Sequence, residues 1–172
     1  MVNNKKPVIT PSEIEALKNQ GLNQTEIAER FGVTRQYISL VKHQVNGFSR
    51  SPREVADDMY PWKGVPSRQA KAYQSKMLRA HAEYQVALGN GMSTEKLRKL
   101  RGFYEKIGRE SLVVEYDPRI PPHKGNSFGG YAYRPKIETD GDLIIRVNEF
   151  SGPLTPEQED FWAYPEELPA LP

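Results

Sequence analysis

The stretch from residue 24 to residue 43 constrains the fold more than any other part of the chain. Asn23, followed three residues later by Glu26, forms a capping-box pattern that predicts the start of a helix. Apolar residues then recur at helical spacing until Gly32, which can adopt the left-handed conformation that a sharp turn requires. Thr34 can cap a second helix. The pattern therefore predicts two short helices joined by a tight turn, which is a helix-turn-helix.

The outer face of the second helix is polar. Side chains able to bond base edges or phosphates lie on or near this face: Thr34, Arg35, Gln36, Ser39, Lys42 and His43. Such a helix lies in the major groove of DNA, where Arg35 suits guanine and Gln36 suits adenine by bidentate hydrogen bonding. Gln24 and Thr25, at the start of the preceding helix, suit contact with phosphates. We predict sequence-specific binding of double-stranded DNA; the alternative is an adaptor bundle with a polar surface.

The rest of the N-terminal region completes this unit. Thr10 and Pro11 predict the start of an earlier helix, which makes a three-helix bundle with the two helices above. We expect a DNA-binding domain over residues 1–48. Repeated glycine and proline then predict a linker over residues 49–66, with a short helix starting at Ser51 and Pro52.

Residues 67–172 are predicted to form a second domain. Ser67 can cap a long helix running towards Leu88, and a basic helix follows around residues 94–107. The periodicity then shifts towards two. Short strands are expected over residues 112–116, 130–134 and 143–147, the last of them after a hairpin-turn signal. The fold class is mainly α with a small β part: an N-terminal helix-turn-helix bundle joined to an α+β C-terminal domain.

Charge is distributed unevenly along the chain. Residues 1–50 carry 7 Lys or Arg against 4 Asp or Glu, and residues 51–110 carry 12 against 7. Residues 111–172 carry 5 against 11, so an acidic end balances a basic first part. A basic surface suits a polyanionic partner, because binding releases counterions condensed on DNA.

The basic helix predicts a second DNA contact beside the helix-turn-helix. Its candidate residues are Lys96, Arg98, Lys99 and Arg101. Arg50 and Arg53 could follow the DNA backbone between the two domains, and Lys124 lies in a long loop that could probe a groove. The alternative for each of these cations is a solvated surface residue.

Catalytic and metal-binding patterns are absent from the sequence. The chain has no cysteine, and its three histidines, His43, His81 and His123, are not spaced as metal ligands. It carries neither a phosphate-binding glycine motif nor a nucleophile elbow. No apolar run is long enough to cross a bilayer. We expect a non-enzyme without metal or cofactor, located in the cytoplasm of a bacterial host at the nucleoid and not at a membrane.

The whole chain resembles the immunity repressors of temperate mycobacteriophages that bind short asymmetric sites called stoperators. The resemblance rests on Thr25, Glu26, Ile27, Ala28, Phe31, Gly32 and Val33, followed by Thr34, Arg35 and Gln36. It rests also on the run from Ser67 through Leu88 into the basic helix at Leu97–Ile107, and on the overall size. It implies repression of early lytic promoters, maintenance of lysogeny, superinfection immunity, and obstruction of transcription at dispersed sites. It also implies that a monomer occupies one site with two DNA-binding regions.

The sequence also bears on the oligomeric state of the protein. The chain has no heptad zipper, and a basic second domain joined by a short linker can supply affinity through effective concentration. We expect a monomer on DNA. Two alternatives stay open: a recombination accessory protein, and a repressor whose second domain binds RNA polymerase or another protein through Tyr60, Trp62, Phe161 and Trp162.

Overall fold

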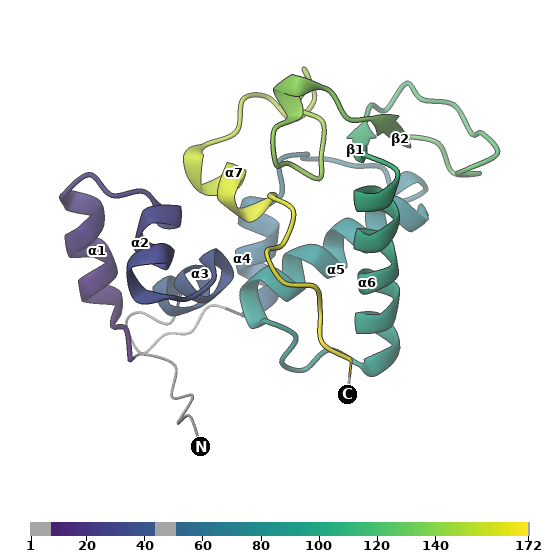
Figure 1. Cartoon of the computed structure of the whole chain (residues 1–172). Helices are drawn as coiled ribbons and strands as arrows, with labels where there is room; N and C mark the ends of the chain where they lie inside the picture. Colours follow the sequence, from purple (N-terminus) through teal and green to yellow (C-terminus); the bar gives the residue numbers. More distant parts are fainter. Residues whose placement is uncertain (1–7, 44–50, 172) are drawn as a thin grey trace.

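The computed structural model describes residues 8–43 and 51–171 of the 172-residue chain. In Figure 1 the described residues form two parts that lie side by side. We call residues 8–43 the N-terminal bundle and residues 51–171 the C-terminal part. The predicted fold class, mainly α with a small β part, is confirmed.

The N-terminal bundle consists of α1 (Pro11–Asn19), α2 (Gln24–Phe31) and α3 (Arg35–His43). The predicted capping boxes form: the Thr10 and Asn23 side chains each accept a bond from the backbone three residues on. Gly32 ends α2 in the left-handed conformation, with φ 61° and ψ 36°. The core of the bundle consists of Ile9, Ile14, Leu17, Ile27, Ala28, Ile38 and Val41.

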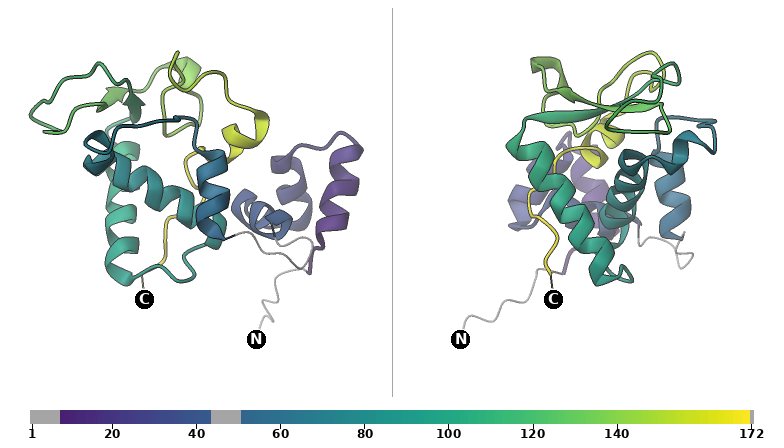
Figure 2. Two further views of the ribbon diagram at one scale, coloured as in Figure 1. Left: turned by 180° about the vertical axis from the view of Figure 1, so that it is seen from behind. Right: turned by 90° about the vertical axis from the view of Figure 1, so that its right-hand side faces the viewer.

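The C-terminal part is built around a central helix. Its elements are α4 (Pro52–Met59), the 3-10 turn η1 (Gln69–Lys71), α5 (Tyr73–Ala87), α6 (Thr94–Arg109), β1 (Leu112–Tyr116), β2 (Tyr131–Pro135), the 3-10 turn η2 (Glu138–Asp140) and α7 (Pro156–Phe161). Helix α5 contacts α4, α6 and β2 (Figure 2). Strands β1 and β2 pair antiparallel, with Val114 opposite Tyr133. Most of α5 is therefore enclosed by its neighbours.

The segment expected as a linker takes part in the second core as far as it is described. Val55 on α4, followed by Met59, Tyr60 and Trp62, is buried in the core of the C-terminal part. The Nε1 atom of Trp162 donates to the carbonyl oxygen of Met59 at 2.9 Å, which ties this segment to α7. The aromatic residues considered as contacts for RNA polymerase are thus interior, because Tyr60, Trp62, Phe161 and Trp162 are all buried. That assignment is corrected: these rings stabilise the core.

One predicted helix boundary and one predicted strand differ from the structure. The long helix begins at Tyr73 and not after Ser67, because Ala72 has an extended conformation. Before that break, the Gln69 side chain bonds the carbonyl oxygen of Pro118 and the hydroxyl of Tyr116, so long-range contacts hold η1 apart from α5. Residues 143–147 do not form a strand. They make isolated bridges, Val114 with Ile145 and Leu143 with Ala163, because each bridge faces a different segment.

Candidate nucleic-acid interface

Close packing with α2 sets the position of α3. Ala28 on α2 is 2% exposed in the core of the bundle, and α2 contacts α3; a small side chain at a helix crossing allows a close approach. The Gln24 side chain is buried, and its Nε2 donates to the carbonyl oxygen of Arg35 at 3.1 Å. Thr34 Oγ1 accepts from the backbone N–H of Tyr37 at 3.2 Å, which caps α3. Gln24 and Thr34 therefore hold the turn together.

The predicted DNA-reading residues occupy different environments. Gln36 is buried, and its Oε1 has no hydrogen-bond partner among the described residues. Thr25 and Ser39 are half-buried. The His43 side chain and Arg50 lie outside the described residues.

The face of α3 that carries Arg35 and Lys42 is directed at the C-terminal part. Arg35 Nε lies 2.9 Å from Glu166 Oε1, and Lys42 Nζ lies 2.6 Å from Glu157 Oε1. Helix α3 also packs against α5. The cations nearest the predicted base-reading surface are thus engaged within the chain.

Three of the four predicted cations of the basic helix α6 also have acidic partners, whereas Arg98 is exposed and forms no ion pair with the described residues. Lys96 pairs with Glu83 on α5. Lys99 pairs with Glu95 one turn away at 2.6 Å. Arg101 bonds Glu105 and, through Nη1, the carbonyl oxygen of Pro169 at 3.0 Å. These pairs are mostly exposed, and exposed ion pairs contribute little to stability, so their partners can be exchanged for phosphates at modest cost.

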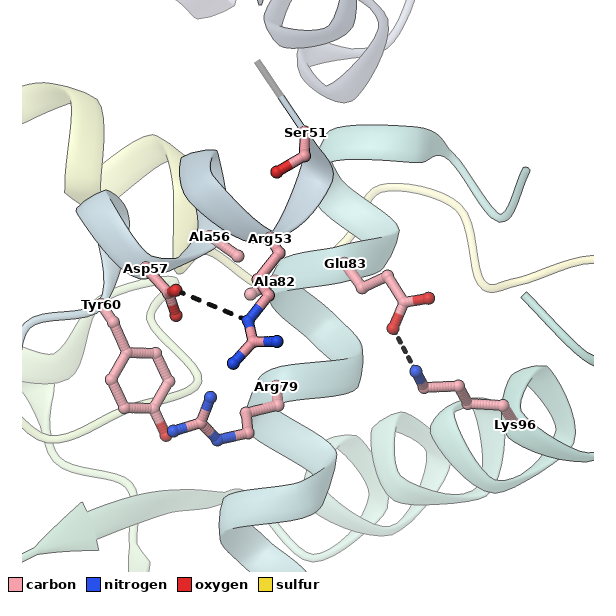
Figure 3. A pocket seen from close by; sticks show the side chains of 9 residues that line it. All are labelled: Ser51, Arg53, Ala56, Asp57, Tyr60, Arg79, Ala82, Glu83 and Lys96. Atoms are coloured by element: carbon pink, nitrogen blue, oxygen red, sulfur yellow. Dashed lines mark hydrogen bonds and ion pairs between the residues drawn. The ribbon is translucent and has the colours of Figure 1, made fainter. Parts of the chain in front are cut away.

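Two hollows lie beside these cations and share Arg79 and Lys96. The first, between α4 and α5 (Figure 3), measures about 490 Å³ and is lined by Ser51, Arg53, Ala56, Asp57, Tyr60, Arg79, Ala82, Glu83 and Lys96. The second lies between α5 and α6, measures about 460 Å³ and is lined by Lys76, Met77, Arg79, Ala80, Ser93, Glu95, Lys96 and Lys99. We call the second hollow the α5–α6 groove.

The α5–α6 groove brings two cations predicted from the sequence together with two that were not predicted. Lys96 and Lys99 were predicted, whereas Lys76 and Arg79 were not. The two missed cations lie three residues apart on α5, a spacing that places them on one helix face. This spacing of three residues is the signal in the sequence that indicates a shared basic face on α5.

Lys124 is placed apart from the groove lining. It is exposed in the turn where His123 and Asn126 exchange backbone hydrogen bonds of 2.9 Å. The next residue, Gly125, accepts a 3.5 Å bond from Gln74, which places the turn beside the first residues of α5.

The described residues include no group of three or more His, Asp or Glu side chains arranged to hold a metal ion. Across residues 8–43 and 51–171, no helix has the length and apolar character needed to cross a bilayer. What the described residues do offer is the α2–α3 unit with its tight turn and a cation-lined groove.

Comparison with known proteins decides the family. The chain is 40% identical over 165 residues to the repressor-like immunity protein of Mycobacterium phage L5, an alignment that covers 95% of this chain and 88% of that protein. The chain belongs to the mycobacteriophage immunity repressors. No known family profile matches it. Since the alignment covers nearly the whole chain, the bundle and the C-terminal part of this immunity repressor both have counterparts in the relative.

Proposed function

We propose that this immunity repressor binds double-stranded DNA sequence-specifically and represses transcription of a temperate phage, thereby maintaining lysogeny and superinfection immunity. The observation that carries the proposal is the α2–α3 unit, in which a left-handed Gly32 joins two capped helices; this arrangement supports a helix-turn-helix. Blocking early promoters and dispersed asymmetric sites follows from the family resemblance. The protein acts by occupying DNA and has no catalytic activity in this proposal.

We infer that the C-terminal part supplies a second DNA contact through the α5–α6 groove. Four cations from two helices line this groove, and a groove of such charge suits the phosphate backbone. The proposed division is a DNA-binding domain over residues 1–48, a connection over residues 49–66 and a second DNA-binding domain over residues 67–172. Two contact regions in one chain allow a monomer to bind an asymmetric site.

Selection of bound duplexes from a random library, followed by footprinting, tests this function. The full chain should enrich one asymmetric sequence, and its footprint should exceed that of residues 1–48. Arg35→Ala should weaken binding by about 1–3 kcal/mol and relax the preference at one base pair. If no sequence were enriched, the proposal of sequence-specific DNA binding would be wrong. Cleavage or rejoining of the bound duplex would favour the recombination accessory instead.

A further inference from the structure

Two cross-contacts join the N-terminal bundle to the acidic end of the chain. Glu157 on α7 holds Lys42, and Glu166 after α7 holds Arg35. The basic partners are largely covered, since 18% of the Arg35 side chain and 28% of the Lys42 side chain are exposed. Such coverage lowers solvent screening of the charges.

A third carboxylate and a third cation extend this contact. Burial raises the pKa of Asp160, while the neighbouring charges of Arg35, Lys18 and Lys42 act in the opposite direction. The pKa of Lys18, on α1, is lowered by burial and by Lys42. The carboxylates of Glu157 and Asp160 act in the opposite direction. We call Glu157, Asp160 and Glu166 the acidic clasp. It faces Lys18, Arg35 and Lys42.

The acidic clasp covers the side of α3 expected to read DNA. Arg35 and Lys42 are seven residues apart, which is about two helical turns, so they project from the same face. A DNA phosphate or base edge would have to take the place of the clasp in front of α3 and pair with the same cations. The clasp and DNA therefore exclude one another on this face.

We propose that the acidic clasp is an intramolecular competitor of DNA: the DNA-free chain is closed, and binding requires α3 to leave both α5 and α7. This inference rests on the proposed DNA binding. It accounts for the acidic end of a chain whose first part is basic. The apparent affinity for DNA is then the intrinsic affinity reduced by the fraction of open chains.

Removing the two clasp ion pairs tests the proposal. In the full chain, E157Q/E166Q should bind a 30-base-pair duplex about three- to thirty-fold more tightly than the unmodified protein. The matched control is E138Q/E167Q, which makes the same change in net charge. Glu138 and Glu167 are exposed, and neither forms an ion pair with the described residues of the bundle. If the two variants bound the duplex with equal affinity, the proposed competition between the clasp and DNA would be wrong. Absence of binding by every protein would instead overturn the proposed DNA-binding function.

A distance measurement gives an independent readout. Because the chain has no cysteine, dyes can be placed at introduced cysteines E29C on α2 and E138C on η2. Energy transfer should change when the duplex is added, and E157Q/E166Q should show part of that change without DNA. Unchanged energy transfer on saturation with the duplex would overturn the proposal even if affinity responded to the variants.

Discussion

His81 shows how one residue links three parts of the core. It is fully buried, with its Nε2 2.7 Å from the carbonyl oxygen of Phe161 and its Nδ1 2.7 Å from the Tyr104 hydroxyl. A carbonyl oxygen only accepts, so Nε2 carries the proton and Nδ1 accepts from Tyr104. The ring stacks on Trp162 at 5.2 Å. The neutral imidazole therefore joins α5, α6 and α7.

This burial predicts a pH-dependent stability. Burial lowers the pKa of His81 from 6.5 to about 4, while its bond to Phe161 acts in the opposite direction. As pH falls through 6.5 the unfolded chain takes up a proton that the folded chain does not, so the free energy of unfolding decreases by about 1.4 kcal/mol per pH unit until pH 4. Urea unfolding between pH 7.5 and 5 measures it. His81→Gln should remove this slope, and an unchanged slope in the variant would contradict the assignment.

Gly32 and Gly102 provide a matched pair of glycine substitutions. An added Cβ would meet nothing within 4 Å at either position, but only Gly32 has a positive φ, +61°. Gly32→Ala should lower the free energy of unfolding by about 1 kcal/mol because of the left-handed backbone. Gly102→Ala, within α6, should raise it by about 0.5–1 kcal/mol through helix propensity. Thermal denaturation compares the two, and changes of the same sign would contradict this explanation.

At the scale of elements, the arrangement of α5 and α6 determines which cations lie together in one groove. The basic residues of α6 spread around its exposed side, whereas the α5–α6 groove combines Lys96 and Lys99 with Lys76 and Arg79. A single helix read from the sequence could not predict this set, because half of its cations come from the neighbouring helix.

The α5–α6 groove gives a prediction on salt dependence. K76A/R79A should weaken binding to all duplexes alike and reduce the slope of log affinity against log salt by about 2, since each phosphate contact contributes about 0.9. R98A/R109A removes the same charge from exposed positions of α6 outside both hollows. Affinity titrations at several salt concentrations compare the pairs. If R98A/R109A reduced the slope more than K76A/R79A, the phosphate contact would lie on the outer face of α6 and not in the α5–α6 groove.

At the scale of the whole molecule, the two separate cores determine how the bundle and the C-terminal part can come apart. The bundle and the C-terminal part each bury their own hydrophobic cluster, and the clasp ion pairs lie between them. The contact between the two parts consists of these ion pairs and of the packing of α3 on α5, and it lies outside both hydrophobic clusters. The two parts can therefore separate while each keeps its own core.

One chain is expected on each DNA site. Light scattering of the complex with the selected duplex should give the mass of one protein and one duplex, because two contact regions in the same chain replace a second subunit. Residues 1–48 alone should bind with lower affinity and a smaller salt slope. Two chains per site, or equal affinity of the fragment and the full chain, would contradict the bipartite monomer.

Features that depend on residues close together in the chain were predicted correctly from the sequence. The helix starts at Thr10, Asn23 and Ser51 agree with prediction because each capping box joins residues three apart. Strand β1 was likewise predicted by its alternating pattern. The strand expected at residues 143–147 failed, because pairing depends on which distant segments come alongside.

The sequence by itself determined helices α2 and α3 and the tight turn between them, since the caps, the apolar spacing and the left-handed Gly32 are local properties of residues 23–41. Only the tertiary structure decided what the outer face of α3 meets. The contact of Arg35 with Glu166 spans 131 residues, and that of Lys42 with Glu157 spans 115. No local pattern encodes such pairs, because they form only after two separately packed cores bring opposite charges together.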